Sequence, residues 1–310
     1  MTRREGLHVL IIGAGAMGCL FASRLKRSGF EVSLLEKSPE VVEAINSRGL
    51  FVGGVSGQHH VTVPVYSDRP PHPPDLVLLC VKSYHTREAA KALSSWLQPE
   101  ACVLTLQNGL GNMEILQALF GKERVLGGTT AEGATVIAPG KIMHAGEGET
   151  VIGSGRAAQE IVSVFQKSGF KALAVDDIRP FLWGKLIINA GINALAAVTR
   201  LKNGRLPELA GTRRIMAEAV QEAVAIVEAR KIDIPYPDPI GRVVDVCRAT
   251  AGNVASMLQD VLNKKQTEIE AINGAIVKEG AALGIPTPVN STLTSLVQAI
   301  EQTYDEQDLG

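Results

Sequence analysis

The sequence predicts an α/β protein with a parallel-sheet domain at the N-terminus and an all-α domain at the C-terminus. With 310 residues, the chain is longer than a single hydrophobic core usually organises, so two domains are expected. Strand-length apolar runs alternate with helical patterns up to residue 177, whereas only helical patterns follow from residue 178. We therefore expect domains at 1–177 and 178–310.

The first structural unit is a strand, a glycine-rich loop, a helix and a second strand within residues 7–36. Its loop, GAGAMG, has the spacing Gly-x-Gly-x-x-Gly between a predicted strand and a predicted helix, which is typical of dinucleotide binding. The glycines permit a tight turn, close approach to a pyrophosphate and helix packing, while the helix N-terminus offers N–H groups to the phosphates. The alternative is a glycine turn that only packs, but both flanks favour a Rossmann-type NAD(P)-binding domain. The loop residues expected at the cofactor are Gly13, Ala14, Gly15, Ala16, Met17 and Gly18.

The alternation continues through the first half of the chain. The expected elements are strands at 75–81, 102–107 and 171–175, helices at 86–97, from about residue 112 and at about 157–168, and short antiparallel runs within 127–155. Such alternation requires a parallel sheet covered on both faces, and ligands bind at the carboxyl ends of its strands. Lys82 and Asn108 follow two of these strands directly, so each could face the cofactor. An ordinary side chain at a strand end is an equally good interpretation of each one.

The second half carries apolar residues at spacings of three and four. The expected helical segments are 181–198, 211–231, 255–284 and a last helix from about Ser291, with breaks at 202–209, 234–239 and 285–290, which all contain proline or glycine.

A polar stripe lies on the first of these helices. Lys185, Asn189 and Asn193 are four residues apart, so they share one face, while Leu and Ile occupy the other directions. Buried amides and a buried ammonium are costly unless they are paired, so a polar group must lie opposite. That group is either a structural hydrogen-bond network or a ligand.

The glycine loop favours the ligand. Hydride transfer from a nicotinamide to a carbonyl leaves an alkoxide, which requires a proton donor. A lysine partly desolvated between the domains has a lowered pKa, as a reversible donor needs, and the two asparagines can hold polar groups of the substrate.

Eight motifs of the sequence resemble motifs of one known family and occur in the same order as in that family. They are GAGAMG, CVKSYHT, LQNGLG, GTTAEGATVIAPGKIMHAGEGETVIG, WGKLIINAGINAL, KNG, ASMLQDV and QTEIEAINGAIV. Over nearly its whole length the chain resembles the ketopantoate reductases (2-dehydropantoate 2-reductases), which use NADPH to reduce ketopantoate to (R)-pantoate in pantothenate (vitamin B5) biosynthesis.

The resemblance implies roles for individual residues. Lys185 would be the proton donor. The substrate's hydroxyl and carboxylate would be held by Asn189, Asn193, Asn203 and Ser256, with the backbone from Asn253 close by. The nicotinamide end of the cofactor would be lined by Lys82, Asn108 and Ala134.

Glu268 and Ser256 have specific alternatives. Glu268 would reach the cofactor or sit near Lys185, where its charge opposes excessive lowering of the lysine pKa. Alternatively, it belongs to a solvated helix face and pairs with Lys264. The alternative for Ser256 is that it only caps or packs a helix.

The end of the second strand departs from the family pattern. Glu36 falls where a carboxylate accepts from a ribose 2′-hydroxyl and selects NAD. The family places a basic residue here for the 2′-phosphate, and Lys37 is the matching residue. We expect NADPH, with NADH as a serious rival.

Composition argues against several other classes of function. The 31 basic residues nearly cancel the 32 acidic ones, so nucleic acid is not an expected partner. Apolar runs are too short to cross a membrane and the N-terminus does not resemble a secretory signal, so a cytoplasmic protein is expected. The scattered cysteines and the His59–His60 pair, expected in a solvated hairpin, give no metal site.

Two other functions remain open. The chain could reduce a different 2-oxo acid on the same two-domain plan, or it could be a non-catalytic NAD(P)-binding module. The presence of Lys185 together with Glu268 argues against the module. The sequence does not give the oligomeric state, for which a homodimer is one candidate.

Overall fold

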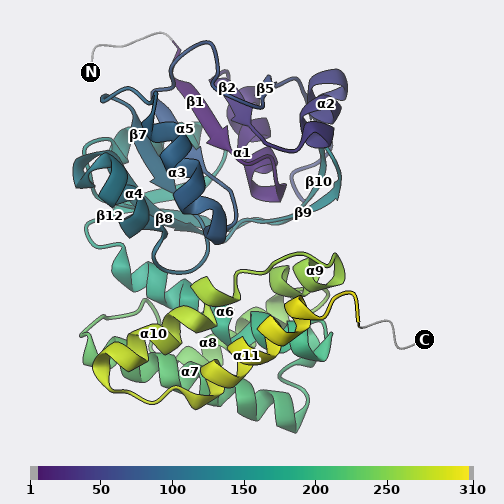
Figure 1. Ribbon diagram of the computed structural model, residues 1–310, viewed down its shortest axis with the longest axis vertical. Coiled ribbons are helices and arrows are strands. Elements are labelled where there is room, and N and C mark those ends of the chain that lie inside the picture. Colours follow the sequence, from purple (N-terminus) through teal and green to yellow (C-terminus); the bar gives the residue numbers. More distant parts are fainter. Residues whose placement is uncertain (1–5, 307–310) are drawn as a thin grey trace. The chain divides into compact units, whose positions relative to one another are not determined.

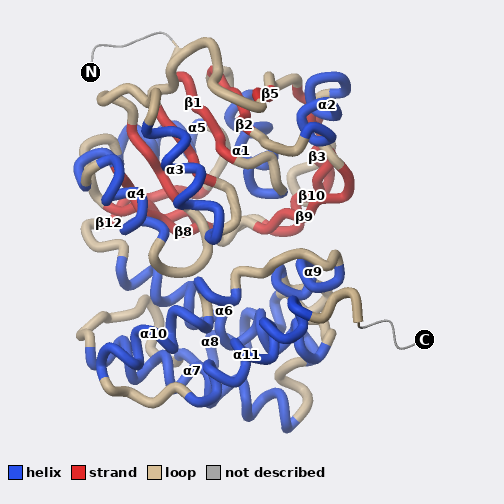
Figure 2. The backbone as a smooth tube through the Cα atoms, viewed as in Figure 1, coloured by secondary structure: helices blue, strands red, loops and turns tan. Residues whose placement is uncertain are grey.

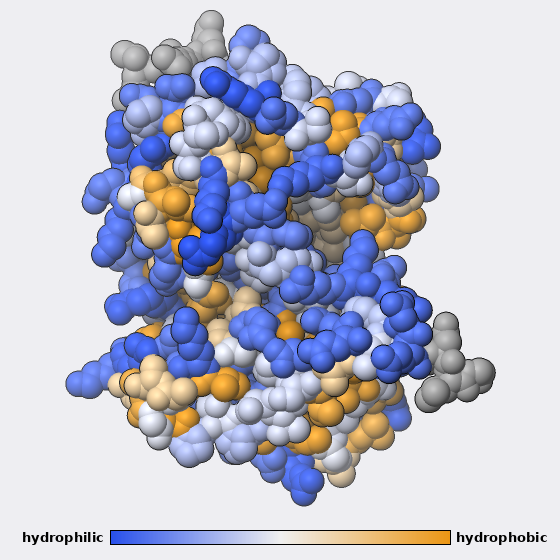
Figure 3. Space-filling view, in the orientation of Figure 1, coloured by the Kyte–Doolittle hydropathy of each residue, from blue (hydrophilic) through white to orange (hydrophobic). Residues whose placement is uncertain are grey.

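The computed structural model describes residues 6–306, which divide into two units. The sheet unit extends to Gln107 and resumes from Gly111 to Ile178. The helical unit contains Asn108–Leu110 and the chain from Arg179 onward (Figure 1). Hydrophilic side chains predominate on the face that Figure 3 presents.

The sheet unit is built around an eight-stranded sheet with the order β12-β11-β8-β7-β6-β1-β2-β5. Figure 2 shows the strands of this unit in red. Its strands are β1 (His8–Ile12), β2 (Glu31–Leu35), β5 (Val65–Tyr66), β6 (Leu76–Leu79), β7 (Cys102–Thr105), β8 (Val125–Thr130), β11 (Glu149–Gly153) and β12 (Lys171–Val175). All pairs from β5 to β8 are parallel, β8 and β11 are antiparallel, and β11 and β12 are parallel. The segment from β5 to β8 has the 3-2-1-4-5-6 order of the doubly wound fold, so the predicted parallel sheet is confirmed.

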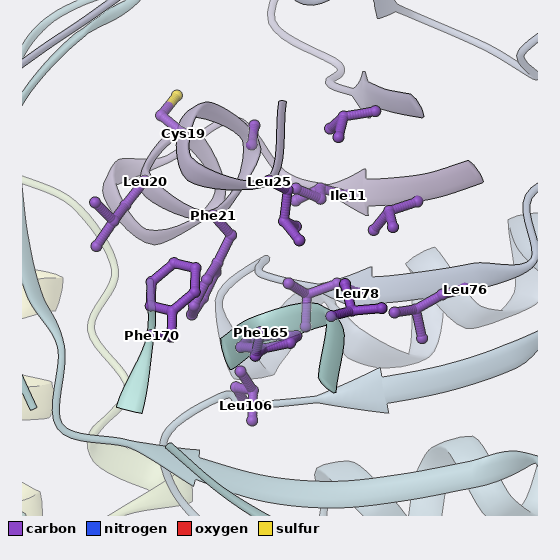
Figure 4. Packing of buried hydrophobic residues seen from close by; sticks show 14 of the residues in the cluster. Ile11, Cys19, Leu20, Phe21, Leu25, Leu76, Leu78, Leu106, Phe165 and Phe170 are labelled. Atoms are coloured by element: carbon purple, nitrogen blue, oxygen red, sulfur yellow. The ribbon is translucent and has the colours of Figure 1, made fainter. Parts of the chain in front are cut away.

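Helices cover both faces of this sheet because its central strands are apolar on both sides. The helices are α1 (Ala16–Arg27), α2 (Pro39–Arg48), α3 (Thr86–Ser94), α4 (Asn112–Phe120) and α5 (Ala158–Lys167). In β1, Val9 and Ile11 join the core with α1 and α5, whereas Leu10 and Ile12 join the core with α3 and α4. On the first face Phe21 of α1 packs against Phe165 and Phe170 with ring centroids 5.6 Å and 5.2 Å away (Figure 4).

A second, four-stranded sheet has the order β4-β3-β10-β9. It consists of β3 (Leu50–Gly54), β4 (His59–Val61), β9 (Gly133–Ala138) and β10 (Lys141–Gly146). The antiparallel pairing expected within 127–155 is confirmed for β9–β10 and β8–β11, but the run is shared between two sheets and β10 pairs with β3 in parallel. Local sequence patterns do not predict this division, because the parallel partner of β10 is β3, which lies far away in the chain.

The predicted hairpin around His59 and His60 forms from β3 and β4, which pair in antiparallel fashion. His60 is exposed and its Nε2 lies 2.7 Å from the carbonyl oxygen of Arg48. Within residues 6–306, no group of three or more His, Cys, Asp or Glu side chains is placed to hold a metal ion.

The helical unit is arranged around α6. Its elements are α6 (Arg179–Thr199), the 3₁₀ helix η3 (Asn203–Arg205), α7 (Ala210–Ala229), α8 (Pro239–Ala249), α9 (Ser256–Leu262), the 3₁₀ helix η4 (Ile269–Ala271), α10 (Asn273–Leu283) and α11 (Pro288–Gln302). Helix α6 contacts α7, α8, α9 and α11 (Figure 1). In the part of the chain that the structure describes, only α6 is long and apolar enough to cross a bilayer, and 67% of its most apolar window is buried inside the protein. Its hydropathy is therefore that of a core helix.

The structure corrects the helix expected over residues 255–284. Helix α9 ends at Leu262, Lys264 adopts a left-handed backbone with φ 52°, and α10 begins only at Asn273. No proline or glycine occurs between these helices, so local composition did not indicate the break. Helix α8, which follows the predicted break at 234–239, was not foreseen.

Candidate active site

The glycine-rich loop has the geometry that each of its glycines was expected to provide. Gly13 has φ 98°, a conformation that side chains rarely adopt. A Cβ on Gly18 would lie 1.9 Å from the carbonyl oxygen of Gly13, so only glycine allows α1 to pack so close to the loop. A Cβ on Gly15 would meet no atom within 4 Å, which leaves the backbone open to a ligand.

The N-terminus of α1 is suited to an anion. The helix begins at Ala16, no side chain caps it, and its first turn contains no acidic residue. The first N–H groups of a helix have no partner within the helix, and the helix dipole favours negative charge there. The loop and this helix end therefore fit the pyrophosphate of a dinucleotide.

A buried glutamine that sequence reasoning missed ties two strand-end loops together. Gln107 Nε2 donates to the carbonyl oxygen of Val81 at 2.7 Å and to Thr86 Oγ1 at 2.8 Å. Lys82 directly follows the first of these acceptors and Asn108 directly follows the glutamine. The available signal was an amide in an apolar strand, where a buried polar group is expected to have partners.

Ala134, the third residue expected at the nicotinamide, lies half-buried in β9 opposite His144 of β10. The adjoining turn is fixed by buried charges. His144 Nε2 lies 2.7 Å from Glu132 Oε2, and Arg24 Nη1 of α1 lies 3.7 Å from Glu132 Oε1. These contacts join α1, which follows the glycine loop, to the strand that carries Ala134.

The side chains at the end of β2 point to different neighbours. Glu36 Oε2 accepts a hydrogen bond from Ala14 N at 2.8 Å, within the glycine loop. Its Oε1 accepts from Lys37 N at 2.8 Å and from Ser38 N at 2.9 Å. Lys37 Nζ pairs with Glu88, and both of these side chains are more than half exposed.

In the helical unit, Lys185 and Glu268 influence each other electrostatically. Burial lowers the pKa of Lys185 to about 8, and the nearby Glu268 carboxylate opposes that decrease. Glu268 is 7% exposed, and its Oε2 accepts from Asn108 Nδ2 at 3.3 Å. The structure therefore brings together three residues that are far apart in the sequence.

The alternative of a solvated helix face at Glu268 does not hold. Glu268 lies outside α9 and α10, and its side chain is buried. Lys264 is not one helical turn away, since its left-handed backbone follows the end of α9.

Asparagine amides with unused hydrogen-bonding atoms lie on the same unit. Asn193 is 6% exposed and Asn203 is 8% exposed. Among the described residues, Asn189 Nδ2 and Asn203 Oδ1 are buried without a hydrogen-bond partner. Leaving such atoms unpaired costs about 1–3 kcal/mol each, so they indicate a place that receives a polar ligand.

The loops that carry Asn203 and Asn253 are joined by their backbones. Asn203 N donates to the carbonyl oxygen of Asn253 at 3.1 Å, and a Cβ on Gly204 would lie 2.6 Å from the Cβ of Ala251. The glycine of KNG is therefore required by close approach of the two loops. Ser256 is exposed at the start of α9, whose N-cap is Ala255, so it neither caps that helix nor packs in the core.

Thr250 fixes which atom of the Asn203 amide stays unpaired. Its Oγ1 donates to the carbonyl oxygen of Val246 at 2.7 Å, so it can only accept from the Asn203 side chain. Asn203 Nδ2 makes that bond at 2.9 Å, which leaves Oδ1 as the atom without a partner. The threonine thus turns the amide so that it presents an acceptor.

Comparison with known proteins finds the same family at both ends of the chain. The model of "Ketopantoate reductase PanE/ApbA" matches residues 9–157, and that of its C-terminal part matches residues 177–301. The 2-dehydropantoate 2-reductase of Archaeoglobus fulgidus is 37% identical over 95% of this chain and 98% of its own length. That of Halobacterium salinarum is 35% identical over 96% of this chain and 99% of its own length.

Solved structures agree. The PanE/ApbA family ketopantoate reductase from Ralstonia eutropha JMP134 has a TM-score of 0.89 and 35% identity, covering 96% of this chain and all of its own. A D-mandelate dehydrogenase solved with NADH and anilino(oxo)acetate also has a TM-score of 0.89, with 27% identity over 96% of this chain and 99% of its own. On this evidence the chain belongs to the ketopantoate reductase family.

Proposed function

We propose that this chain reduces ketopantoate to (R)-pantoate with NADPH, the cofactor of the family, in pantothenate biosynthesis. The observation that carries the proposal is the ammonium of Lys185, which lies near the carboxylate of Glu268. Its burial lowers its pKa to about 8. A group with this pKa is mostly protonated at neutral pH and can still release its proton, which suits a reversible general acid.

The chemistry divides between cofactor and chain. The nicotinamide, when bound, supplies the hydride. Lys185 Nζ gives its proton to the carbonyl oxygen as that oxygen gains negative charge, and the resulting neutral amine regains a proton from water. Glu268 keeps Lys185 protonated before the step, because its negative charge favours the ammonium.

The sheet unit would hold the cofactor through its glycine loop and strand ends. Gly13 to Gly18 would face the pyrophosphate, and Lys37 would reach the 2′-phosphate. Lys82, Asn108 and Ala134 would line the nicotinamide end, with Glu268 near it. The open space at Gly15 and the uncapped start of α1 support the first of these roles.

The asparagines would hold the substrate. Asn189 Nδ2 is an unused donor suited to a carboxylate, and Asn203 Oδ1 is an unused acceptor suited to a hydroxyl. Asn193, Ser256 and the Asn253 backbone would complete this set. Ketopantoate carries both of these groups, whereas a 2-oxo acid without a hydroxyl would leave the Asn203 acceptor unpaired.

A second candidate is a reductase of another 2-oxo acid. The D-mandelate dehydrogenase likeness favours it, because that structure contains a different oxo acid on the same fold. Following NADPH absorbance with ketopantoate and with 3,3-dimethyl-2-oxobutanoate, which lacks only the hydroxyl, separates the two. Much faster turnover with ketopantoate supports the proposal, whereas equal or slower turnover contradicts it. Cofactor binding without any turnover would instead support a non-catalytic module.

We also infer a cytoplasmic enzyme that binds neither nucleic acid nor membranes, since substrate and cofactor are both water-soluble small molecules. A homodimer is the assembly to test, and light scattering on the purified protein would detect it.

A further inference from the structure

The carboxylate of Glu36 is held rigidly beside the glycine loop. Gly13 N donates to the carbonyl oxygen of Leu35 at 2.8 Å, which brings the ends of β1 and β2 together. The Glu36 backbone is fixed on its other side, where its N–H donates to the carbonyl oxygen of Tyr66 at 2.9 Å. Its side chain then accepts from the N–H groups of Ala14, Lys37 and Ser38. Such a carboxylate cannot turn away from a ligand without losing several hydrogen bonds to backbone.

Its remaining hydrogen-bonding capacity suits a hydroxyl. An ionised carboxylate has about four acceptor sites and no donor, and the backbone N–H groups of Ala14, Lys37 and Ser38 occupy three. A ribose 2′-hydroxyl can donate to the site that is left. A 2′-phosphate offers only acceptors at neutral pH and carries up to two negative charges, so it would be repelled.

The nearby cation does not reverse this preference. Lys37 Nζ pairs with Glu88, so the charged side chains around the end of β2 include one ammonium and two carboxylates, those of Glu36 and Glu88. The lysine and its partner are well exposed, and exposed ion pairs are weak, so Lys37 can reach a phosphate at little cost. Its attraction would still be offset by the fixed charge of Glu36.

We propose that Glu36 is a specificity-determining residue, which makes this chain bind NADH at least as tightly as NADPH by accepting from the ribose 2′-hydroxyl and repelling a 2′-phosphate. The inference rests on the proposed function only in taking a nicotinamide dinucleotide as the ligand. It adds NADH as a hydride donor beside the family's NADPH.

Binding of the two reduced nucleotides to the free protein tests this. The wild type, Glu36→Gln and Glu36→Asp would each be titrated with NADH and with NADPH in the absence of any 2-oxo acid. The fluorescence of the bound nicotinamide would report binding. The glutamine keeps the size and removes the charge, so we expect the NADPH to NADH affinity ratio to rise about tenfold or more. The aspartate keeps the charge, so the ratio should stay near that of the wild type.

Two results would contradict this role of Glu36. The inference is overturned if the wild type binds NADPH more tightly than NADH, or if Glu36→Gln changes both affinities by the same factor, as a purely structural role would. Thermal unfolding of each variant shows whether the loop remains folded. The titration contains no oxo acid, so its result does not depend on the proposed reaction. If the chain bound both nucleotides as expected but failed to reduce ketopantoate in a separate assay, the proposed function would be refuted and this inference would stand.

Discussion

The sheet unit and the helical unit differ in how their proposed sites are built. In the sheet unit the phosphate site is backbone, and the residues that shape it are consecutive, from Gly13 to Gly18. In the helical unit the proposed site consists of side chains from α6, η3, the start of α9 and the segment before η4, together with the backbone of Asn253. A backbone site needs glycines at fixed spacing, so it leaves a local signature. A site assembled from distant side chains leaves only single polar residues in the sequence, and these come together only after folding.

Removing the amine in the helical unit should have the largest effect. Lys185→Ala should reduce kcat by about 10³-fold, within the range typical of losing a general acid. The affinity for NADPH should change little, because the proposed phosphate site, the glycine loop, belongs to the sheet unit. Steady-state kinetics and nucleotide titration check both parts. Lys185→Met would be the control for side-chain volume, and unchanged kcat in either variant would remove the lysine from the mechanism.

A single methyl group in the glycine loop should have the converse effect. In Gly18→Ala the new Cβ would fall 1.9 Å from the Gly13 carbonyl oxygen, so the loop and α1 must move apart. We expect cofactor affinity to fall about 100-fold and stability to fall by about 1–3 kcal/mol, as overpacking usually costs. Gly15→Ala is the control for stability alone, because its Cβ meets no protein atom within 4 Å but would occupy the space through which the cofactor approaches this backbone. A normal dissociation constant in Gly18→Ala would contradict the role of close packing.

These two units were not equally predictable from the sequence. The parallel sheet and the glycine loop followed from alternation and spacing, and the stripe on α6 followed from helical periodicity. The second sheet did not, because β3 and β10 pair across a long stretch of chain. Nor did the break before η4, where no proline or glycine occurs, although it is this break that leaves Glu268 buried outside a helix. Gln107 and Thr250 were missed because their roles depend on partners that only folding brings within reach.

Removing the charge of Glu268 should shift the pH dependence of the assembled site. The folded pKa of Lys185 lies below its usual 10.5, at about 8, so the protonated donor is lost and kcat/KM falls as the pH rises through about 8. In Glu268→Gln the lysine pKa should decrease further, since the carboxylate raises it, and this alkaline limb should move to lower pH. The loss should reach tens of fold at pH 8 and be smaller at pH 6. A pH–rate profile with an unmoved limb would show that Glu268 does not act through Lys185.

Releasing the Asn203 amide should change substrate preference more than rate. Thr250→Val removes the acceptor that orients Nδ2, so the amide can rotate and Oδ1 no longer faces the ligand reliably. The preference for ketopantoate over 3,3-dimethyl-2-oxobutanoate should fall about tenfold, which corresponds to one neutral hydrogen bond. Thr250→Ser keeps the hydroxyl and should restore the preference. If Thr250→Val lowered kcat/KM equally for both acids, the threonine would be only structural.

The smallest effect is expected where an exposed side chain acts on the backbone-built site. Lys37→Ala should lower the affinity for NADPH by no more than about fivefold, because the ammonium is exposed and already paired with Glu88. NADH affinity should not change, since NADH lacks the 2′-phosphate. Glu88→Gln is the complementary variant, because it removes the ion pair of Lys37 and should raise the affinity for NADPH slightly. Equal weakening of both nucleotides in Lys37→Ala would show that this lysine does not read the 2′-phosphate. Discrimination at the end of β2 would then rest on the backbone-anchored carboxylate alone.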